Sequence, residues 1–149
     1  MLKFVIKRET EVDRDKIFSL STNIEQFPKL MPKYFKSLTI KEKRNSDFYV
    51  EEEILFLKNT FKVKTKHLIK SPNIHEIHIL SGVFKNSSFI ESYEISNGRT
   101  QVIILVNLKF NGLFKFLYLF RSLIAHRISK TMDEFIFNCE RHATHALNS

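Results

Sequence analysis

The sequence has few of the residues that cross-link, bend or interrupt a chain. Its single cysteine, Cys139, excludes a disulfide within the chain and predicts a reducing, cytoplasmic location. Because there are only three glycines and three prolines, flexible linkers and disordered regions are not expected. The length predicts one domain over residues 1–149, long enough to bury a core. The longest apolar run, residues 113–125, includes two charges and is too short to span a bilayer.

Sequence motifs for several kinds of chemistry are also missing. There is no glycine-rich phosphate-binding loop, no G-x-S-x-G nucleophile elbow and no Cys/His pair suited to nucleophilic catalysis. His75 and His78 are three residues apart in a strand-like segment, so they point to opposite faces. His142 and His145 near the C-terminus are better explained as exposed helix residues than as metal ligands. We therefore expect neither a metal site nor a cofactor.

The chain contains instead a series of strand-like segments. Residues 2–12 alternate between polar and apolar, which predicts a half-buried strand rather than a signal peptide. Asp13 can cap a short helix, and Pro28 and Pro32 bracket a second helical segment. Further strand-like segments lie at residues 35–43, 48–57, 60–69, 74–81, 87–96 and 99–110. This order predicts a sheet that is interrupted once, early in the chain, by two short helices.

Two turns set the predicted register of the hairpins. A two-residue turn at Lys58-Asn59 places Glu52 opposite Thr65 and collects the apolar residues of both strands on one face. Asn97-Gly98 between two alternating segments is a strong hairpin signal, and it sets the register of a later hairpin in the same way. The polar residues that fall on the inward, apolar face are Glu52, Thr65, His67 and Glu91.

The last third of the chain differs from the rest. From residue 113 to about residue 147 it contains no proline or glycine, and apolar residues recur at helical spacing, which predicts one long C-terminal helix. The first three turns carry more apolar residues than a helix that buries one face requires. The face expected to pack on the sheet consists of Leu113, Leu117, Phe120, Ile124, Ile128, Met132, Phe135 and Cys139.

Several features of this arrangement occur together in one superfamily. They are the helix start at 12–18 (VDRDKIF), the segment 23–28 (NIEQFP) leading to Met31-Pro32, Gly82 between strands, the segment 97–102 (NGRTQV) and the long closing helix. In order and spacing they resemble the START/polyketide cyclase-like (SRPBCC) superfamily, most of all its coenzyme-Q-binding and polyketide cyclase-dehydrase branch. The resemblance implies an α+β helix-grip fold. In this fold a seven-stranded curved antiparallel sheet surrounds the long C-terminal helix, and two short helices lie between strands 1 and 2.

The resemblance also implies a hydrophobic cavity between the sheet and the helix, holding a small ligand such as a lipid, isoprenoid or quinone. The 15 phenylalanines agree with this, because so many rings must fill a core, line a pocket or contact a membrane. Binding of such a molecule, with its transfer as an extension, is the function that we expect. The expected cavity residues are Phe48, Val50, Glu52, Ile54, Phe56, Phe61, Val63, Thr65, His67, Phe89, Glu91, Tyr93, Val102, Ile104, Val106, Leu108, Leu117, Phe120, Ile124 and Ile128.

The polar residues on the inward face leave a second function open. A carboxylate that faces an apolar interior must be paired, hydrated or protonated. Glu52, His67 and Glu91 could therefore act as acid and base in a cyclase/dehydratase-type enzyme. A structural pairing with Arg8, on the inward side of the first strand, would explain these residues without catalysis. We assign no catalytic residue from the sequence and favour binding without catalysis.

The net charge of +8 indicates an anionic partner. The start of the C-terminal helix could touch an anionic membrane transiently, which would make the protein peripheral. The residues concerned are Phe114, Lys115, Phe116, Tyr118 and Arg121. A less favoured alternative is RNA or a ribosome bound by a row of lysines, since no aromatic residues on that face could stack on bases. These lysines are Lys36, Lys62, Lys64 and Lys66. The sequence leaves the identity of the ligand and the oligomeric state open.

Overall fold

The structure, a computed structural model, describes the backbone of residues 1–148 and the side chains of residues 1–144. The strands form a seven-stranded antiparallel sheet in the order β1-β7-β6-β5-β4-β3-β2. The elements in chain order are β1 (Leu2–Thr10), α1 (Arg14–Thr22), the 3₁₀ helix η1 (Ile24–Gln26), α2 (Phe27–Leu30), β2 (Phe35–Arg44), β3 (Asp47–Phe56), β4 (Asn59–Lys70), β5 (Ile74–Ile79), β6 (Ser88–Ser96), β7 (Arg99–Leu108), the 3₁₀ helix η2 (Gly112–Phe120) and α3 (Arg121–Asn148).

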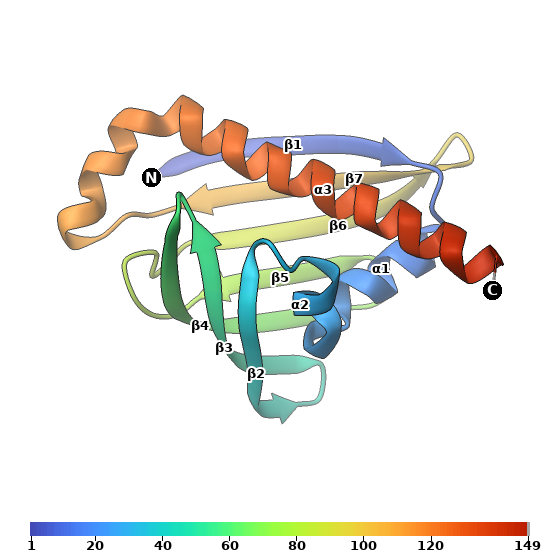
Figure 1. Cartoon of the computed structure of the whole chain (residues 1–149), viewed down its shortest axis with the longest axis horizontal. Helices are drawn as coiled ribbons and strands as arrows, with labels where there is room; N and C mark the ends of the chain where they lie inside the picture. The colour runs from blue at the N-terminus through green and yellow to red at the C-terminus, as the bar shows by residue number, and fades with distance from the viewer. Residues whose placement is uncertain (149) are drawn as a thin grey trace.

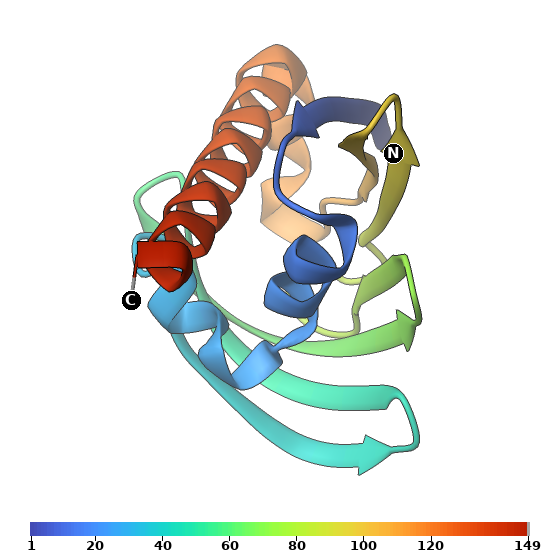
Figure 2. The ribbon, with the colours of Figure 1, turned by 90° about the vertical axis from the view of Figure 1, so that its right-hand side faces the viewer.

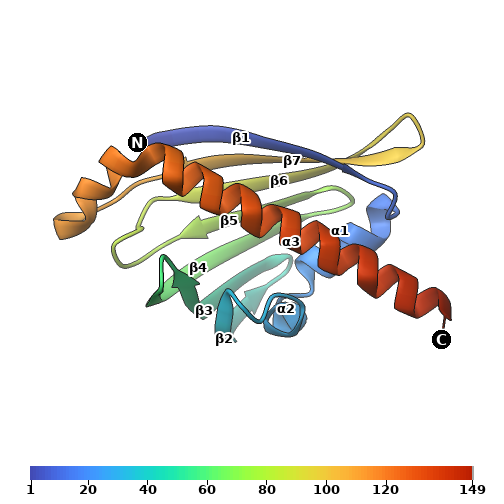
Figure 3. The same cartoon turned by 45° about the horizontal axis from the view of Figure 1, so that its top comes forward.

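The sheet curves around α3, which crosses its inner face diagonally (Figures 1 and 3). At one end, α1 packs against β5, β6 and α3, whereas α2 packs against β2 and α3 (Figure 2). Two irregularities in the β2–β3 pairing, at residues 35–37 and 40–42, bend this edge of the sheet. The predicted α+β arrangement of a curved sheet, two early short helices and a C-terminal helix is therefore confirmed.

The β6–β7 hairpin has the predicted register. Asn97 and Gly98 form its turn with positive φ angles of 52° and 75°, as a two-residue turn of this kind requires. Glu91 consequently lies opposite Ile104. This register follows from residues that tolerate positive φ at low cost.

The β3–β4 hairpin differs from the prediction, because its turn lies at Leu57-Lys58 and not at Lys58-Asn59. Asn59 pairs with Phe56, and its side-chain amide donates a 3.0 Å hydrogen bond to the Leu57 carbonyl oxygen. Leu and Lys seldom adopt the positive φ angles that they have in this turn, so no residue type in the sequence indicates it. Each pair slips by two residues, which leaves every side chain on its predicted face.

The C-terminal helix is interrupted, because its first turns form the separate helix η2. This segment runs in a different direction from α3, as the orange segment at the left of Figure 1 shows. A 3₁₀ helix has about 3.0 residues per turn instead of 3.6, so the predicted face does not continue through it. Leu113 and Phe120 are therefore exposed, by 92% and 50%, and the prediction that they pack on the sheet was wrong.

From Ile124 onward the predicted face of α3 packs on the sheet. Ile124, Met132, Phe135 and Cys139 are buried, and Ile128 is partly buried. None of the described helices is long and apolar enough to cross a membrane. The side chain of His145, one member of the terminal histidine pair, lies outside the described residues.

Candidate functional site

A cavity of about 220 Å³ lies between α3, the short helices and the inner face of the sheet. Most of its wall is apolar, with aromatic side chains contributed by α2, β2, β3, β6 and α3. An engineered apolar cavity of roughly 150 Å³ is already large enough to bind benzene. The space is therefore sufficient for a small ring system or a short hydrocarbon chain.

Many of the residues predicted from strand alternation lie in the wall of this cavity. They come from β3, β4, β6, β7 and α3, and their side chains lie on the inner side of the sheet or on the helix face opposite it. They are Glu52, Ile54, Phe56, Val63, Thr65, His67, Phe89, Glu91, Ile104, Leu108 and Ile128.

The other predicted residues lie outside the cavity wall. Several of them point inward but are covered: Tyr93 packs against Phe18 of α1, and Phe61 packs against Phe114 of η2. Phe120 is half exposed on η2. Alternation along a strand shows which face a side chain is on, but not whether a neighbouring element covers it. The residues placed elsewhere are Phe48, Val50, Phe61, Tyr93, Val102, Val106, Leu117, Phe120 and Ile124.

The sequence reasoning missed a whole side of the cavity. This side is built by the segment from α1 to the start of β2, and no local pattern reveals how two short helices pack over a sheet. His75 was also missed, although alternation with Ile77 and Ile79 places it on the inward face. The main missed residues of the short-helix side are Ser21, Ile24, Phe27, Met31, Tyr34 and Phe35.

Five polar residues of the cavity wall form a continuous series of hydrogen bonds from β3 to β6, which we call the polar chain. Thr65 Oγ1 donates to Glu52 Oε2 at 2.5 Å, and His67 Nε2 lies 3.1 Å from Thr65 Oγ1. His67 Nδ1 lies 2.9 Å from His75 Nε2, and the two rings stack. His75 Nδ1 lies 3.0 Å from Glu91 Oε1. Both histidines are buried, so these contacts are shielded from water.

Strand pairing explains why the members of the polar chain meet. His75 lies directly opposite Glu91 in the β5–β6 pairing. His67 is a diagonal neighbour of His75 across β4–β5, and long side chains reach one another in that position. The slipped β3–β4 register makes Glu52 a diagonal neighbour of Thr65 rather than its direct partner. The chain thus depends on four strands whose order in the sheet follows their order in the sequence.

The hydrogen-bond geometry also assigns the protons of the polar chain. His75 Nδ1 faces a carboxylate and must donate, so its Nε2 accepts the Nδ1–H of His67 while the His75 ring is neutral. His67 Nε2 is then directed at Thr65 and Glu52.

Two neighbouring groups are kept in their protonated forms by burial. Burial raises the pKa of Tyr93 well above its ordinary value, with a further increase from the charge of Glu91. The Tyr93 hydroxyl donates a 3.2 Å hydrogen bond to Glu91 Oε1. Burial likewise raises the pKa of the Cys139 thiol to about 12. At neutral pH, Tyr93 is therefore a hydrogen-bond donor to Glu91, and Cys139 is an unreactive thiol.

Arg8 does not neutralise the inward carboxylates. Its guanidinium forms a 2.6 Å ion pair with Asp133 of α3, and both side chains are substantially exposed. The pairing of Glu52 or Glu91 with Arg8, which the sequence left open, is not formed. The polar chain is instead balanced by histidines and hydroxyl groups.

Neither a protein-family model nor a curated protein matches the sequence of this chain. Solved structures do match its architecture. The Zhui aromatase/cyclase from Streptomyces sp. R1128 has a TM-score of 0.81 at 10% identity, over 95% of this chain and 94% of that one. A START superfamily protein from Mycobacterium smegmatis has a TM-score of 0.81 at 12% identity, over 95% and 99% of the two chains.

A third solved structure, the 18 kDa protein CC1736 from Caulobacter crescentus, has a TM-score of 0.71 at 17% identity over 100% of both chains. The chain has a START-like helix-grip fold. Identities this low show the fold alone. The resemblance to the coenzyme-Q-binding branch stays a prediction.

Within this START-like fold, η2 is apolar on its outer side. Leu113 and Leu119 are 92% and 83% exposed, and Phe116 is also exposed. Lys115 and Arg121 lie exposed among them. Exposed apolar side chains of this number on one short segment are typical of an interaction site.

The inner side of η2 packs beside the cavity without lining it. Phe114 packs edge-on against Phe61, with ring centroids 5.8 Å apart. The Tyr118 hydroxyl accepts a 2.9 Å hydrogen bond from the backbone N–H of Phe110, which lines the cavity. The membrane-contact residues predicted from the sequence therefore divide into two groups. Phe116, Lys115 and Arg121 are exposed, whereas Phe114 and Tyr118 are partly buried.

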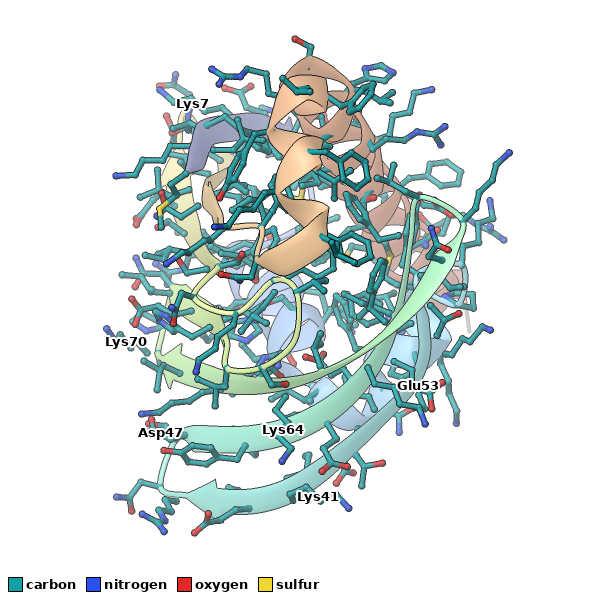
Figure 4. The ribbon with its side chains drawn as sticks, turned by 90° about the vertical axis from the view of Figure 1, so that its left-hand side faces the viewer. Lys7, Lys41, Asp47, Glu53, Lys64 and Lys70 are labelled. Atoms are coloured by element: carbon teal, nitrogen blue, oxygen red, sulfur yellow. The ribbon has the colours of Figure 1, made fainter. Side chains whose placement is uncertain are left out.

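The lysine row considered for RNA lies among acidic residues on the outer face of the sheet. In the β3–β4 pairing Lys62 lies opposite Glu53 and Lys64 opposite Glu51. Lys41 of β2 forms a 3.6 Å ion pair with Glu51. Figure 4 shows Lys41, Glu53 and Lys64 on this outer side. Charges of both signs alternate here, which suits a phosphate backbone less than a continuous basic patch does.

Proposed function

We propose that this protein binds a small hydrophobic molecule, such as a lipid, isoprenoid or quinone, in the cavity between α3 and the sheet. The observation that carries the proposal is the mostly apolar cavity of about 220 Å³ with one polar wall. Burying apolar ligand surface there contributes about 25 cal/mol per Å². The polar chain gives such a ligand a place for one polar group, so the apolar part lies against α2, β2 and α3.

The state of the polar chain favours binding over catalysis. Each ring nitrogen of His67 and His75 already has a partner within the chain. A cyclase/dehydratase-type mechanism that uses a histidine as its base needs a ring nitrogen that is free to reach the substrate. A hydrogen-bonded wall of this kind is better suited to orienting a ligand than to attacking one.

The proposal predicts a specific loss of binding when the cavity is filled. Ile128→Trp places an indole against the cavity and should weaken binding of the neutral fluorescent probe N-phenyl-1-naphthylamine by about tenfold or more. Fluorescence titration measures the affinity, and native mass spectrometry of the fresh protein with extraction of its contents identifies any natural ligand. The matched control is Ile95→Trp, since Ile95 is 65% exposed on β6 and outside the cavity. Equal affinities of the two variants, both folded by circular dichroism, would contradict the proposal.

We further propose that the outer side of η2 touches an anionic membrane surface during ligand exchange. Exposed leucine and phenylalanine side chains there are accompanied by Lys115 and Arg121, which complement lipid phosphates. The same segment packs beside the cavity, where Tyr118 is hydrogen-bonded to the wall residue Phe110, so a movement of η2 at the membrane would loosen this end of the wall and open a path for the ligand.

The membrane proposal is tested with vesicles. The double variant Leu113→Glu/Leu119→Glu should reduce co-sedimentation with phosphatidylglycerol-containing vesicles by about tenfold, because it removes apolar contact and adds repulsion. Ile95→Glu, on a different exposed surface, is the control and should sediment like the wild type. Binding that survives the double variant, or that is absent in the wild type at low salt, would overturn this part.

A further inference from the structure

The wall of the cavity has the opposite charge character to the protein as a whole. The chain has a formal net charge of +8, yet no lysine or arginine is among the residues that line the cavity, within the part of the chain that the structure describes. The charged or titratable residues in the wall are Glu52, His67, His75 and Glu91, with the Tyr34 hydroxyl at the α2–β2 side. A ligand therefore meets acidic groups and no permanent cation.

The hydrogen-bond donors of the wall are already used within the protein. Ser21 Oγ donates to the Phe18 carbonyl oxygen at 2.9 Å, and Tyr34 donates to Glu134 Oε2 at 2.8 Å. Thr131 Oγ1 donates to the Arg127 carbonyl oxygen at 3.0 Å. The hydroxyl of Thr65 and the N–H groups of the two histidines are consumed in the polar chain. An anionic head group would find no free side-chain donor there.

Acceptors, in contrast, remain available. The recorded contacts of the two glutamates use Oε2 of Glu52 and Oε1 of Glu91. No hydrogen bond among the described residues reaches Glu52 Oε1 or Glu91 Oε2. Neither oxygen is a buried atom that lacks a partner, so both are accessible. Both residues line the cavity, so a bound molecule can supply the missing donors.

Charges on the surrounding elements do not reverse this character. Arg8 of β1 is paired with Asp133 of α3, and Lys33 is paired with Glu134 on the exposed side of α3. Lys16 of α1 acts on the buried Cys139 but does not line the cavity. Arg127 and Glu134 of α3 act on the wall residue Tyr34 with opposite signs, and neither lines the cavity. Glu52 and Glu91 are therefore the carboxylates that a bound molecule meets in the wall itself.

From this arrangement we infer that the cavity selects hydrophobic molecules whose head group donates hydrogen bonds: alcohols, phenols, reduced quinols or amines. Carboxylates and phosphates are disfavoured, because they bring negative charge and need donors that the wall lacks. This inference rests on the proposed binding function. Within the expected ligand classes it favours an isoprenoid alcohol or a quinol over a fatty acid or an oxidised quinone.

A series of ligands with one tail and different heads tests the inference. 1-Octanol, octylamine and octanoate compete at neutral pH with N-phenyl-1-naphthylamine bound to the full chain. We expect octanol and octylammonium to displace the probe at concentrations about tenfold lower than octanoate does. Octanoate binding as tightly as octanol, while the probe binds normally, would overturn the selectivity and leave the binding function intact. If neither the probe nor any octyl compound binds, the binding function fails, and the selectivity fails with it.

Matched variants assign the selectivity to the two glutamates. Glu52→Gln and Glu91→Gln each replace a charged acceptor by an amide that can also donate, so octanoate should gain about tenfold and octylammonium should lose about tenfold. Glu94→Gln is the control, because Glu94 lies on the outer face of β6 and accepts from Asn73. Two glutamate positions are used so that one misfolded variant does not end the test. Unchanged head-group preference in a folded Glu52→Gln or Glu91→Gln protein would overturn the inference.

Discussion

His75→Phe is expected to lower the free energy of unfolding by about 3 kcal/mol, measured by urea denaturation at neutral pH. His75 bonds to His67 on one side and to Glu91 on the other, and it is almost fully buried. Phenylalanine fits the volume of the ring but leaves the His67 N–H without an acceptor and Glu91 with one donor fewer. The large effect comes from buried polar groups that lose a hydrogen-bond partner, and not from the creation of a cavity.

The matched control for this prediction is His78→Phe. His78 lies on the same strand three residues away, on the opposite face and outside the polar chain. We expect its stability to stay within about 1 kcal/mol of the wild type. Equal losses in the two variants would show that the polar chain contributes nothing specific to stability. The same preparations, titrated with the fluorescent probe, show whether the polar wall also orients the ligand.

Ile124→Ala is expected to cost about 2–5 kcal/mol, because it removes a fully buried side chain where α3 packs on the sheet. The cost is large because α3 is held by one apolar face, so a cavity there cannot be filled by shifting another element. The higher helix propensity of alanine offsets less than about 0.7 kcal/mol of it. Urea denaturation and calorimetry measure the loss.

Leu123→Ala provides the internal comparison, since the neighbouring Leu123 is 46% exposed and its replacement gains the same helix propensity. We expect a change within about 0.5 kcal/mol. A loss at Leu123 as large as that at Ile124 would mean that the outer side of the helix is also buried in solution, for example against a second copy of the chain.

The two hairpins show where local sequence predicts register and where it does not. Asn97-Gly98 combines two residues that adopt positive φ readily, so the turn and the whole β6–β7 pairing could be predicted. Leu57 and Lys58 carry no such signal, and the register of β3–β4 slipped by two residues from the prediction. Each side chain nevertheless lies on the predicted face of the sheet, because side chains alternate with a period of two.

The candidate site was predictable in part for the same reason. Alternation placed Glu52, Thr65, His67 and Glu91 on the inward face. It could not join them into one series, because the link is His75, and its contacts depend on pairing β5 with both β4 and β6. Residues that are local in sequence define a face, whereas a hydrogen-bonded chain across four strands is a property of the assembled sheet.

The sequence by itself determined the strand segments, the Asn97-Gly98 turn, the buried face of α3 after Ile124 and the excess of apolar residues near residue 113. All of these depend on the conformational preferences and periodicity of neighbouring residues. Only the tertiary structure decided that η2 departs from α3, that the short helices supply one side of the cavity, and which inward residues remain uncovered. An inward-facing side chain is buried in the core when another element packs over it, and it lines a cavity when none does. The elements that pack over it lie far away in the chain, so its local sequence does not decide the outcome.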